Sequence, residues 1–245
     1  MTPQSHMAQI SEILLHSRAC ITTAEQMLPL FKVDSLTTEK IAAHAFFCRC
    51  IDHFRAAVLL AKEDLDPEAI ALVRGIVETT FVIGGLLTGS VTIEEMEAFD
   101  LAGRAKGAKA QDDFLRRYGS LDLRERVKDF AERNAGPTLK FQEIAKKIDA
   151  DDLYNGHYRM FSHVAAHPSM SSISKYLEYG EHLTSVRYPG IGYQKRTTLL
   201  IACGVLLHTC AAVENWLGTT PDVNRTIHAR LLEHESFGSV VDRSS

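Results

Sequence analysis

The chain has 245 residues, of which 45% are hydrophobic and 24% are charged, and its formal net charge at pH 7 is −4. This composition is that of a globular protein and excludes low-complexity disorder and collagen-like repeats. The small negative charge gives no global attraction to nucleic acid or to an anionic membrane, although a local basic patch is compatible with it. We therefore expect no double-stranded DNA partner and no membrane partner.

The cysteines and the N-terminal residues indicate the cellular compartment of the protein. Five cysteines are scattered through apolar stretches without a CxxC pair, which excludes thioredoxin-type redox motifs and cysteine-based zinc knuckles and favours buried free thiols. The first residues, MTPQSHMAQISEILL, lack the basic and then apolar regions of a signal peptide. The longest uncharged run, residues 197–213, is shorter than a bilayer span. We expect a cytoplasmic protein.

Apolar residues recur at spacings of three and four, which predicts helices almost throughout. The first helix begins near Ile10 and ends before Pro29. The second runs from about Ser35 to Lys62, and its predicted buried stripe is Ile41, Ala45, Cys48, Ile51, Val58 and Leu59. The third is opened by Asp66-Pro67-Glu68, with Asp66 as the N-cap, and its predicted core stripe is Ile70, Val73, Val77, Phe81 and Gly84.

The character of the chain changes between Glu94 and Asp152, where charges of both signs are dense. Thr92 and Glu95 have capping-box spacing and open a pair of exposed helices that ends at residues 134–137. Helices over 139–148 and 152–166 follow, and residues 168–192 are predicted to be a loop. The last long helix spans 194–216 and ends at Gly218, and a short helix covers 223–235.

These elements predict an all-α fold. We expect a helical bundle of four long core helices, with the charged helical pair inserted between the third and the later core helices. Residues 1–236 form a single domain and residues 237–245 a flexible tail. A polar interior that faces another subunit is consistent with a homodimer, which we expect.

The third helix carries the first candidate site residues. Arg74 and Glu78 are the only charges between Glu68 and Glu94, and their spacing of four places them on one helix face. A helix that is apolar nearly all round is buried, and buried charges are rarely left unpaired. The pair is therefore either a structural ion pair or part of an internal polar site.

The segment HYRMFSHVAAHPS is unusually rich in titratable and hydroxyl groups. Its candidate site residues are Tyr158, Arg159, Ser162, His163 and His167, next to His157. Tyr158 and Ser162 share a helix face at a spacing of four, as do His163 and His167. Such density favours a functional site, to which we assign Arg74 and Glu78 as well.

Together these segments carry a family resemblance. A helical VRGIVE element, a polar helix pair, and then Y-x-x-x-S with a following histidine and proline resemble the bacterial domain of unknown function 5677 family over residues 40–217. The matching positions are Arg74, Glu78, Tyr158, Ser162 and His167. Four residues separate Ser162 from His167, where the family has three. His163 is therefore an alternative to His167 as the residue that corresponds to the family's histidine. The resemblance implies an all-α fold and no established activity.

The chain is more distantly similar to the HEPN superfamily of helical RNA-cleaving and nucleotide-binding domains, found in toxin and phage-defence systems. Their signature is an arginine, four to six residues and a histidine, a pair suited to metal-free RNA cleavage. Here three residues separate Arg159 from His163, and seven separate it from His167. The similarity implies a defence or stress protein that binds a nucleotide or an RNA phosphate, without a cofactor.

Two alternatives stay open. His163 and His167 form an H-x-x-x-H pair, whose spacing lets two imidazoles share one divalent metal ion, with a third ligand from His44, His53 or His208. Alternatively, the cluster is a closed hydrogen-bond network in a non-catalytic homodimeric interaction module. The C-terminal group of His228, Arg230 and His234 is predicted to be solvated.

Overall fold

A computed structural model describes residues 3–32, 37–165, 170–179, 182–188, 194–218 and 221–239. The regular secondary structure of this part of the chain is helical apart from one small antiparallel sheet, so the all-α prediction is confirmed. The long helices are α1 (Pro3–Met27), α2 (Thr38–Lys62), α3 (Asp66–Thr88), α4 (Ile93–Tyr118), α5 (Leu121–Arg133), α10 (Lys195–Leu217) and α11 (Pro221–Ser239). Between them lie η1 (Leu28–Lys32), α6 (Phe141–Lys147), α7 (Asp151–Leu153), the π-helical turn η2 (Tyr154–Tyr158), α8 (Arg159–Ala165), α9 (Met170–Ile173), η3 (Ser174–Tyr176), β1 (Leu177–Tyr179) and β2 (Leu183–Val186).

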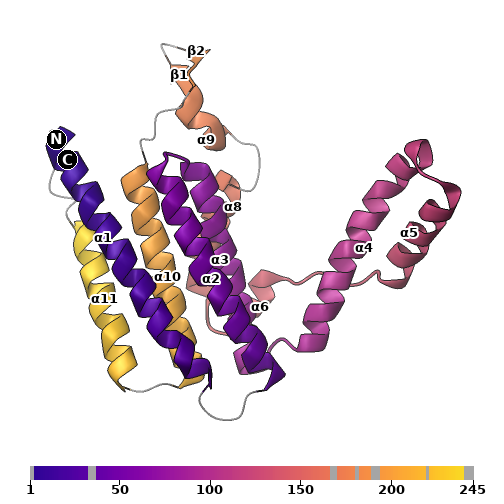
Figure 1. Ribbon diagram of the computed structural model, residues 1–245, viewed down its shortest axis with the longest axis horizontal. Coiled ribbons are helices and arrows are strands. Elements are labelled where there is room, and N and C mark those ends of the chain that lie inside the picture. The colour runs from indigo at the N-terminus through magenta and orange to yellow at the C-terminus, as the bar shows by residue number, and fades with distance from the viewer. Residues whose placement is uncertain are drawn as a thin grey trace.

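Helices α1, α2, α3, α10 and α11 form the bundle (Figure 1). The most extensive contact is between α2 and α3, and α10 packs against α3, α1, α2 and α11. Large side chains fill the space between these helices and are fully buried, among them Phe47, Phe54, Phe81, Leu199 and Leu206. All five predicted core residues of α3 are buried.

The buried face of α2 differs from the predicted one. Ile41 and Leu59 are 55% and 62% exposed, and Ala45 and Cys48 are exposed as well. The helix instead buries Ala43, Phe47, Cys50, Ile51, Phe54, Ala57 and Ala61. Both stripes have helical spacing, and the face with two phenylalanines removes more apolar surface from water. Cys48 is thus an exposed thiol, whereas the other four cysteines are buried.

Local sequence explains where α3 and α4 begin and end. Leu65, rather than Asp66, is the N-cap of α3, and Pro67 lies in its first turn. The helix ends at Gly89, whose φ of 71° is in the left-handed region that favours glycine. The predicted capping box of α4 is present, because the Thr92 side chain accepts from the Glu95 amide and Glu95 accepts from the Thr92 amide.

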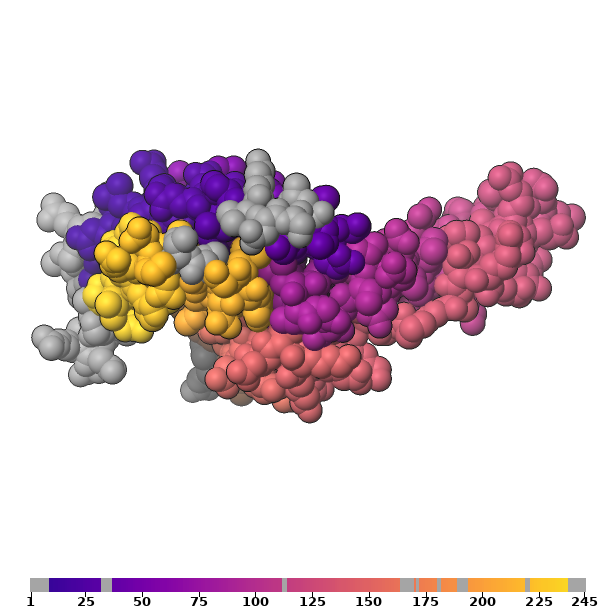
Figure 2. Space-filling model, turned by 90° about the horizontal axis from the view of Figure 1, so that it is seen from below, coloured from indigo at the N-terminus to yellow at the C-terminus, as the bar shows by residue number. Residues whose placement is uncertain are grey.

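The charged pair α4 and α5 projects away from the bundle as an arm (Figures 1 and 2). The two helices pack on each other, and α5 has no buried residue. Ion pairs one turn apart, such as Lys128–Glu132, line the outside of the arm. Near its tip, Phe114, Tyr118 and Leu121 are 61%, 74% and 77% exposed. The insertion therefore leaves the bundle core uninterrupted.

The segment after α8 is more ordered than predicted. Within residues 168–192, which the sequence predicts as a loop, α9, η3 and the antiparallel pair of β1 and β2 form. The strands are three and four residues long, too short for an alternating pattern to be visible. At the C-terminus, α11 continues to Ser239, past the predicted domain end at residue 236.

In the described part of the chain, α3 and α10 are each long and apolar enough to cross a membrane by length and composition. In both helices 67% of the apolar window is buried inside the bundle. Core helices of soluble proteins meet the same criterion when they are covered on most sides.

A glycine in α3 tests the close packing of the bundle. A Cβ at Gly84 would lie 2.6 Å from Ile148 Cδ1 and 2.6 Å from Trp216 Cη2. We expect Gly84→Ala to lower the free energy of unfolding by about 1–3 kcal/mol, because the core must shift to admit the methyl group. Urea denaturation measures this change.

The matched control is Gly103→Ala in α4, where nothing lies within 4 Å of the added Cβ. There alanine should raise stability by up to about 1 kcal/mol through its helix propensity. Equal effects at both positions would contradict the packing of α3 against α6 and α10.

Candidate functional site

Arg74, Glu78 and Tyr158 meet at one edge of the bundle, and we call them the polar triad. The Arg74 Nη2 donates to Glu78 Oε1 at 2.5 Å and to the Tyr158 hydroxyl at 3.4 Å. The Tyr158 hydroxyl in turn donates to Glu78 Oε1 at 3.1 Å. Tyr158 thus closes a ring of three hydrogen-bonded groups with two residues that lie 84 and 80 positions earlier in the chain.

Aromatic packing holds the Tyr158 ring in this position. Its centroid lies 5.1 Å from that of Tyr154, 6.0 Å from that of Phe141 and 6.2 Å from that of Phe81. The Arg74 Cζ lies 5.4 Å from the same centroid, within cation–π range. Tyr158 is the last residue of the π-helical turn η2, and such turns occur frequently at functional sites.

The triad is partly exposed, which corrects the prediction of an interior site. The Arg74 and Glu78 side chains are 28% and 26% exposed. The reason is that α2 and α10 cover one side of α3, while the short elements η2, α6 and α8 cover the other incompletely. Burial acts to lower the pKa of Arg74, but the Tyr158 hydroxyl and the Glu78 carboxylate outweigh it and raise that pKa. The guanidinium is therefore a permanent cation.

Three polar atoms at or near the triad are buried without a hydrogen-bond partner among the described residues. They are Arg74 Nε, Ser162 Oγ and His157 Nδ1. The His157 ring stacks on Phe161, and burial, with a contribution from His208, lowers its pKa. Buried polar groups are normally satisfied, so unsatisfied ones indicate a place that takes water or a ligand.

The remaining predicted site residues are not part of the triad. Ser162 is half-buried, one turn beyond Tyr158 in α8, whereas Arg159 and His163 are exposed on that helix. His167 lies outside the described residues, so the H-x-x-x-H metal pair stays a prediction. Of its suggested third ligands, His44 stacks on Phe31, and the His53 Nδ1 lies 2.9 Å from where a Cβ of Gly75 would be.

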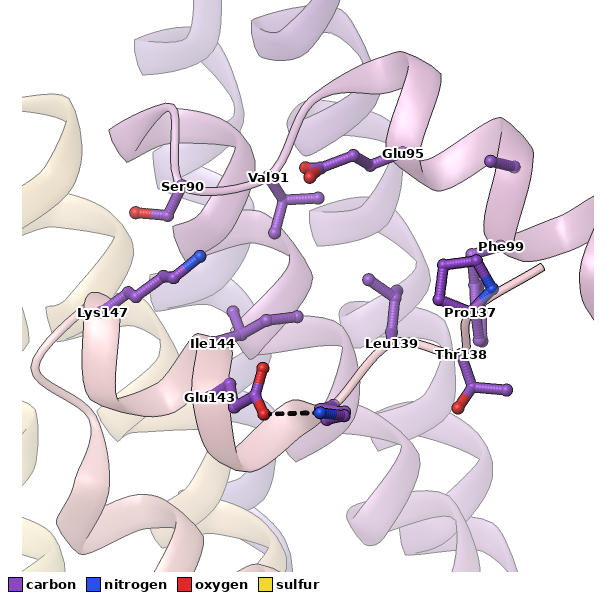
Figure 3. A pocket seen from close by; sticks show the side chains of 12 residues that line it. Ser90, Val91, Glu95, Phe99, Pro137, Thr138, Leu139, Glu143, Ile144 and Lys147 are labelled. Carbon is purple, nitrogen blue, oxygen red and sulfur yellow. Dashed lines mark hydrogen bonds and ion pairs between the residues drawn. The ribbon is translucent and has the colours of Figure 1, made fainter.

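A pocket of about 300 Å³ lies elsewhere, where the arm leaves the bundle (Figure 3). It is bounded by the α3–α4 connection, the start of α4, the segment before α6, and α6 itself. Lys140 and Glu143 form an ion pair of 2.8 Å at its edge, and Ile144 and Leu139 contribute apolar surface. None of the described residues lining it is a predicted site residue, so the pocket and the triad are separate features.

A second polar cluster was missed by the sequence analysis. His16 and Cys20 on α1, Cys203 on α10 and His234 on α11 lie together, and His16 and both cysteines are buried. The prediction that Arg230 and His234 are solvated is therefore wrong, since both are half-buried, whereas His228 is exposed. The spacing of four between His16 and Cys20 was a visible signal, but no local pattern links it to a residue of α10.

Comparison with known proteins supports the family resemblance. The model of a family described as "Family of unknown function (DUF5677)" matches residues 40–182, more than half of the chain. No curated protein and no solved structure matches the chain. The matched range contains the whole polar triad, whereas α1, α10 and α11 lie outside it.

The hydroxyl of Tyr158 provides a direct test of the triad geometry. Tyr158→Phe keeps the aromatic packing and removes one donor and one acceptor, so we expect a loss of about 1 kcal/mol in the free energy of unfolding. Tyr154→Phe, in the same π-helical turn, removes a hydroxyl outside the triad and should cost less. Urea denaturation of both variants tests this, and a larger loss for Tyr154→Phe would contradict the network.

Proposed function

We propose that this chain, which belongs to the family of unknown function DUF5677, binds the phosphate of a nucleotide or of single-stranded RNA at the polar triad. The observation that carries the proposal is the position of Arg74. It is a permanent cation at a partly exposed edge of a largely apolar helix, and its buried Nε has no partner among the described residues.

The donors of Arg74 suit a phosphate oxygen. A guanidinium has five N–H donors in a planar fork, and the hydrogen bonds to Glu78 and Tyr158 both run through Nη2. These two bonds fix the plane of the guanidinium, so less side-chain entropy is lost when an anion binds to its remaining donors. Glu78 reduces the net positive charge, which favours a weak site that releases its ligand.

Groups suited to proton transfer lie beside the anchor. Tyr158 donates to the Glu78 carboxylate, so a proton can pass between the hydroxyl and the carboxylate along one hydrogen bond of 3.1 Å. Ser162 lies one turn beyond Tyr158, and its hydroxyl has no hydrogen-bond partner among the described residues. We assign Arg74 the role of phosphate anchor and Glu78 with Tyr158 the role of an acid–base pair.

The second candidate is a non-catalytic homodimeric module in which the triad only joins α3 to η2. The closed ring of hydrogen bonds favours it, because Arg74, Glu78 and Tyr158 all bond to one another. A partly buried hydrogen-bond network of this kind can fix helix register. The two candidate functions differ in one expected result. Only the first predicts that substitution of Arg74 weakens phosphate binding while the chain stays folded.

The binding experiment compares Arg74→Gln with the wild-type chain. Fluorescence anisotropy with a short labelled single-stranded RNA, and competition by unlabelled nucleoside mono- and triphosphates, would give the affinity for each source of phosphate. We expect Arg74→Gln to weaken binding about tenfold or more, since a charged hydrogen-bond partner is lost. Binding of a fluorescently labelled nucleotide in the same assay, without binding of the RNA, would assign the site to a nucleotide.

Arg126→Gln is the matched control. Arg126 is likewise paired with a carboxylate one helical turn away, Asp122, but it is exposed on the arm, and its substitution should leave the affinity unchanged. The proposal fails if the folded wild-type chain binds none of these ligands, or if Arg74→Gln binds them as the wild type does. A mere loss of stability in Arg74→Gln, with no binding by the wild type, would favour the structural module.

A further inference from the structure

The cluster of His16, Cys20 and Cys203 has the composition of a metal site. His16 and Cys20 face the same way on α1 because they are one turn apart, and α1 packs directly on α10, which carries Cys203. One ligand atom from each residue lies within 4.8 Å of the other two. The three residues are 2%, 0% and 0% exposed, so bulk water does not compete for their side chains.

The separation of the donor atoms fits a single tetrahedral ion. The His16 Nε2 and the Cys20 Sγ are 3.5 Å apart. With zinc–nitrogen and zinc–sulfur bonds of usual length, two tetrahedral ligands have their donor atoms about 3.6 Å apart. These two side chains are therefore already at the distance at which they can share an ion.

The other ring nitrogen of His16 faces a carboxylate. The His16 Nδ1 lies 3.5 Å from Glu233 Oε1 on α11. Histidine ligands of metals commonly donate their second N–H to such a carboxylate, which leaves the other nitrogen free to bind the ion. Glu233 is 45% exposed while His16 is buried, so the carboxylate connects the cluster to the surface.

His234 and its surroundings point to the same site. The His234 ring stacks on that of His16, with centroids 5.4 Å apart. A Cβ at Gly204, next to Cys203, would lie 2.9 Å from the His234 Nε2, so glycine leaves the space that this imidazole occupies. The Nδ1 of His234 is buried without a hydrogen-bond partner among the described residues. A buried imidazole nitrogen without a partner indicates a place that takes water or a ligand.

We propose that His16, Cys20 and Cys203 bind a zinc ion that joins α1 to α10 in the core of the bundle. Histidine with cysteine sulfur is a donor set typical of Zn²⁺, whereas magnesium and calcium take oxygen ligands. Each cysteine binds as a thiolate after loss of its thiol proton, so two negative charges balance the doubly charged ion in the low-dielectric interior. Water, or His234 after a small ring rotation, supplies the fourth ligand.

The ion would link elements that all lie outside the matched family range, namely the first helix and the last two. Its role is therefore to hold both ends of the chain on the bundle, independently of the triad.

The first test is metal analysis of untagged, reduced protein that has been purified without chelators. Mass spectrometry should find about one zinc per chain, and cobalt added to the metal-free chain should give the sulfur-to-cobalt charge-transfer absorption of thiolate ligands. The wild-type chain alone shows whether zinc binds, so this test does not depend on the folding of any variant. Metal-free protein that binds neither ion after reconstitution would overturn the proposal.

Variants then locate the ion. Cys203→Ala should lose the zinc and the cobalt band, whereas Cys210→Ala, which removes another buried thiol from α10, should keep both. A chelator should lower the Tm of the wild type and of Cys210→Ala but not that of Cys203→Ala. Zinc retained by Cys203→Ala would overturn the assignment. Arg74→Gln should bind zinc normally, so this test is independent of the proposed function.

Discussion

The burial of α3 is the constraint on which the other features of the structure depend. This helix is apolar on almost every side, and α2, α10 and the segment from α6 to α8 are arranged so that each covers part of it. The hydrophobic effect, at roughly 25 cal/mol per Å² of apolar surface, makes this enclosure the main source of stability. Glycines at positions 84 and 85 let Trp216, Ile148 and Val91 approach the helix backbone.

The same constraint explains the polar triad. A charge on a helix that must be covered is costly unless it is paired, so Arg74 and Glu78 lie at the edge of α3 and pair with each other. Tyr158 completes the ring, and the π-helical turn brings its hydroxyl to the carboxylate while its ring packs among aromatics. The segment between α3 and η2 can leave the bundle as the arm of α4 and α5. The triad and the core need only the two ends of this segment to lie on the bundle.

The sequence predicted much of this through local signals. The capping box at Thr92 and Glu95, the C-cap at Gly218 and the core stripe of α3 are set within a few residues, and they are present as predicted. The grouping of Arg74 and Glu78 with Tyr158 was predicted from their chemistry, and the structure brings these three together. The face of α2 was wrong because two apolar stripes had the same period, and only tertiary packing selects between them.

The group of His16, Cys20, Cys203 and His234 could not be predicted, since its members come from three helices and only the first two share a local pattern. The partial exposure of Arg74 likewise depends on how completely the short elements cover α3. Local sequence patterns thus predict helices and side-chain pairs that are one turn apart. The residues of a site that is formed by distant helices become known only from the tertiary packing of those helices.

The central claim, that the triad is a ligand site with Arg74 as its anchor, is tested most directly by NMR of arginine side chains. The Nε–Hε signal of Arg74, assigned by its absence in Arg74→Lys, would be followed during titration with a nucleotide or a short RNA. We expect a saturable shift of this signal, while that of Arg126 stays in place. An Arg74 signal that does not move at ligand concentrations that shift other parts of the chain would contradict it.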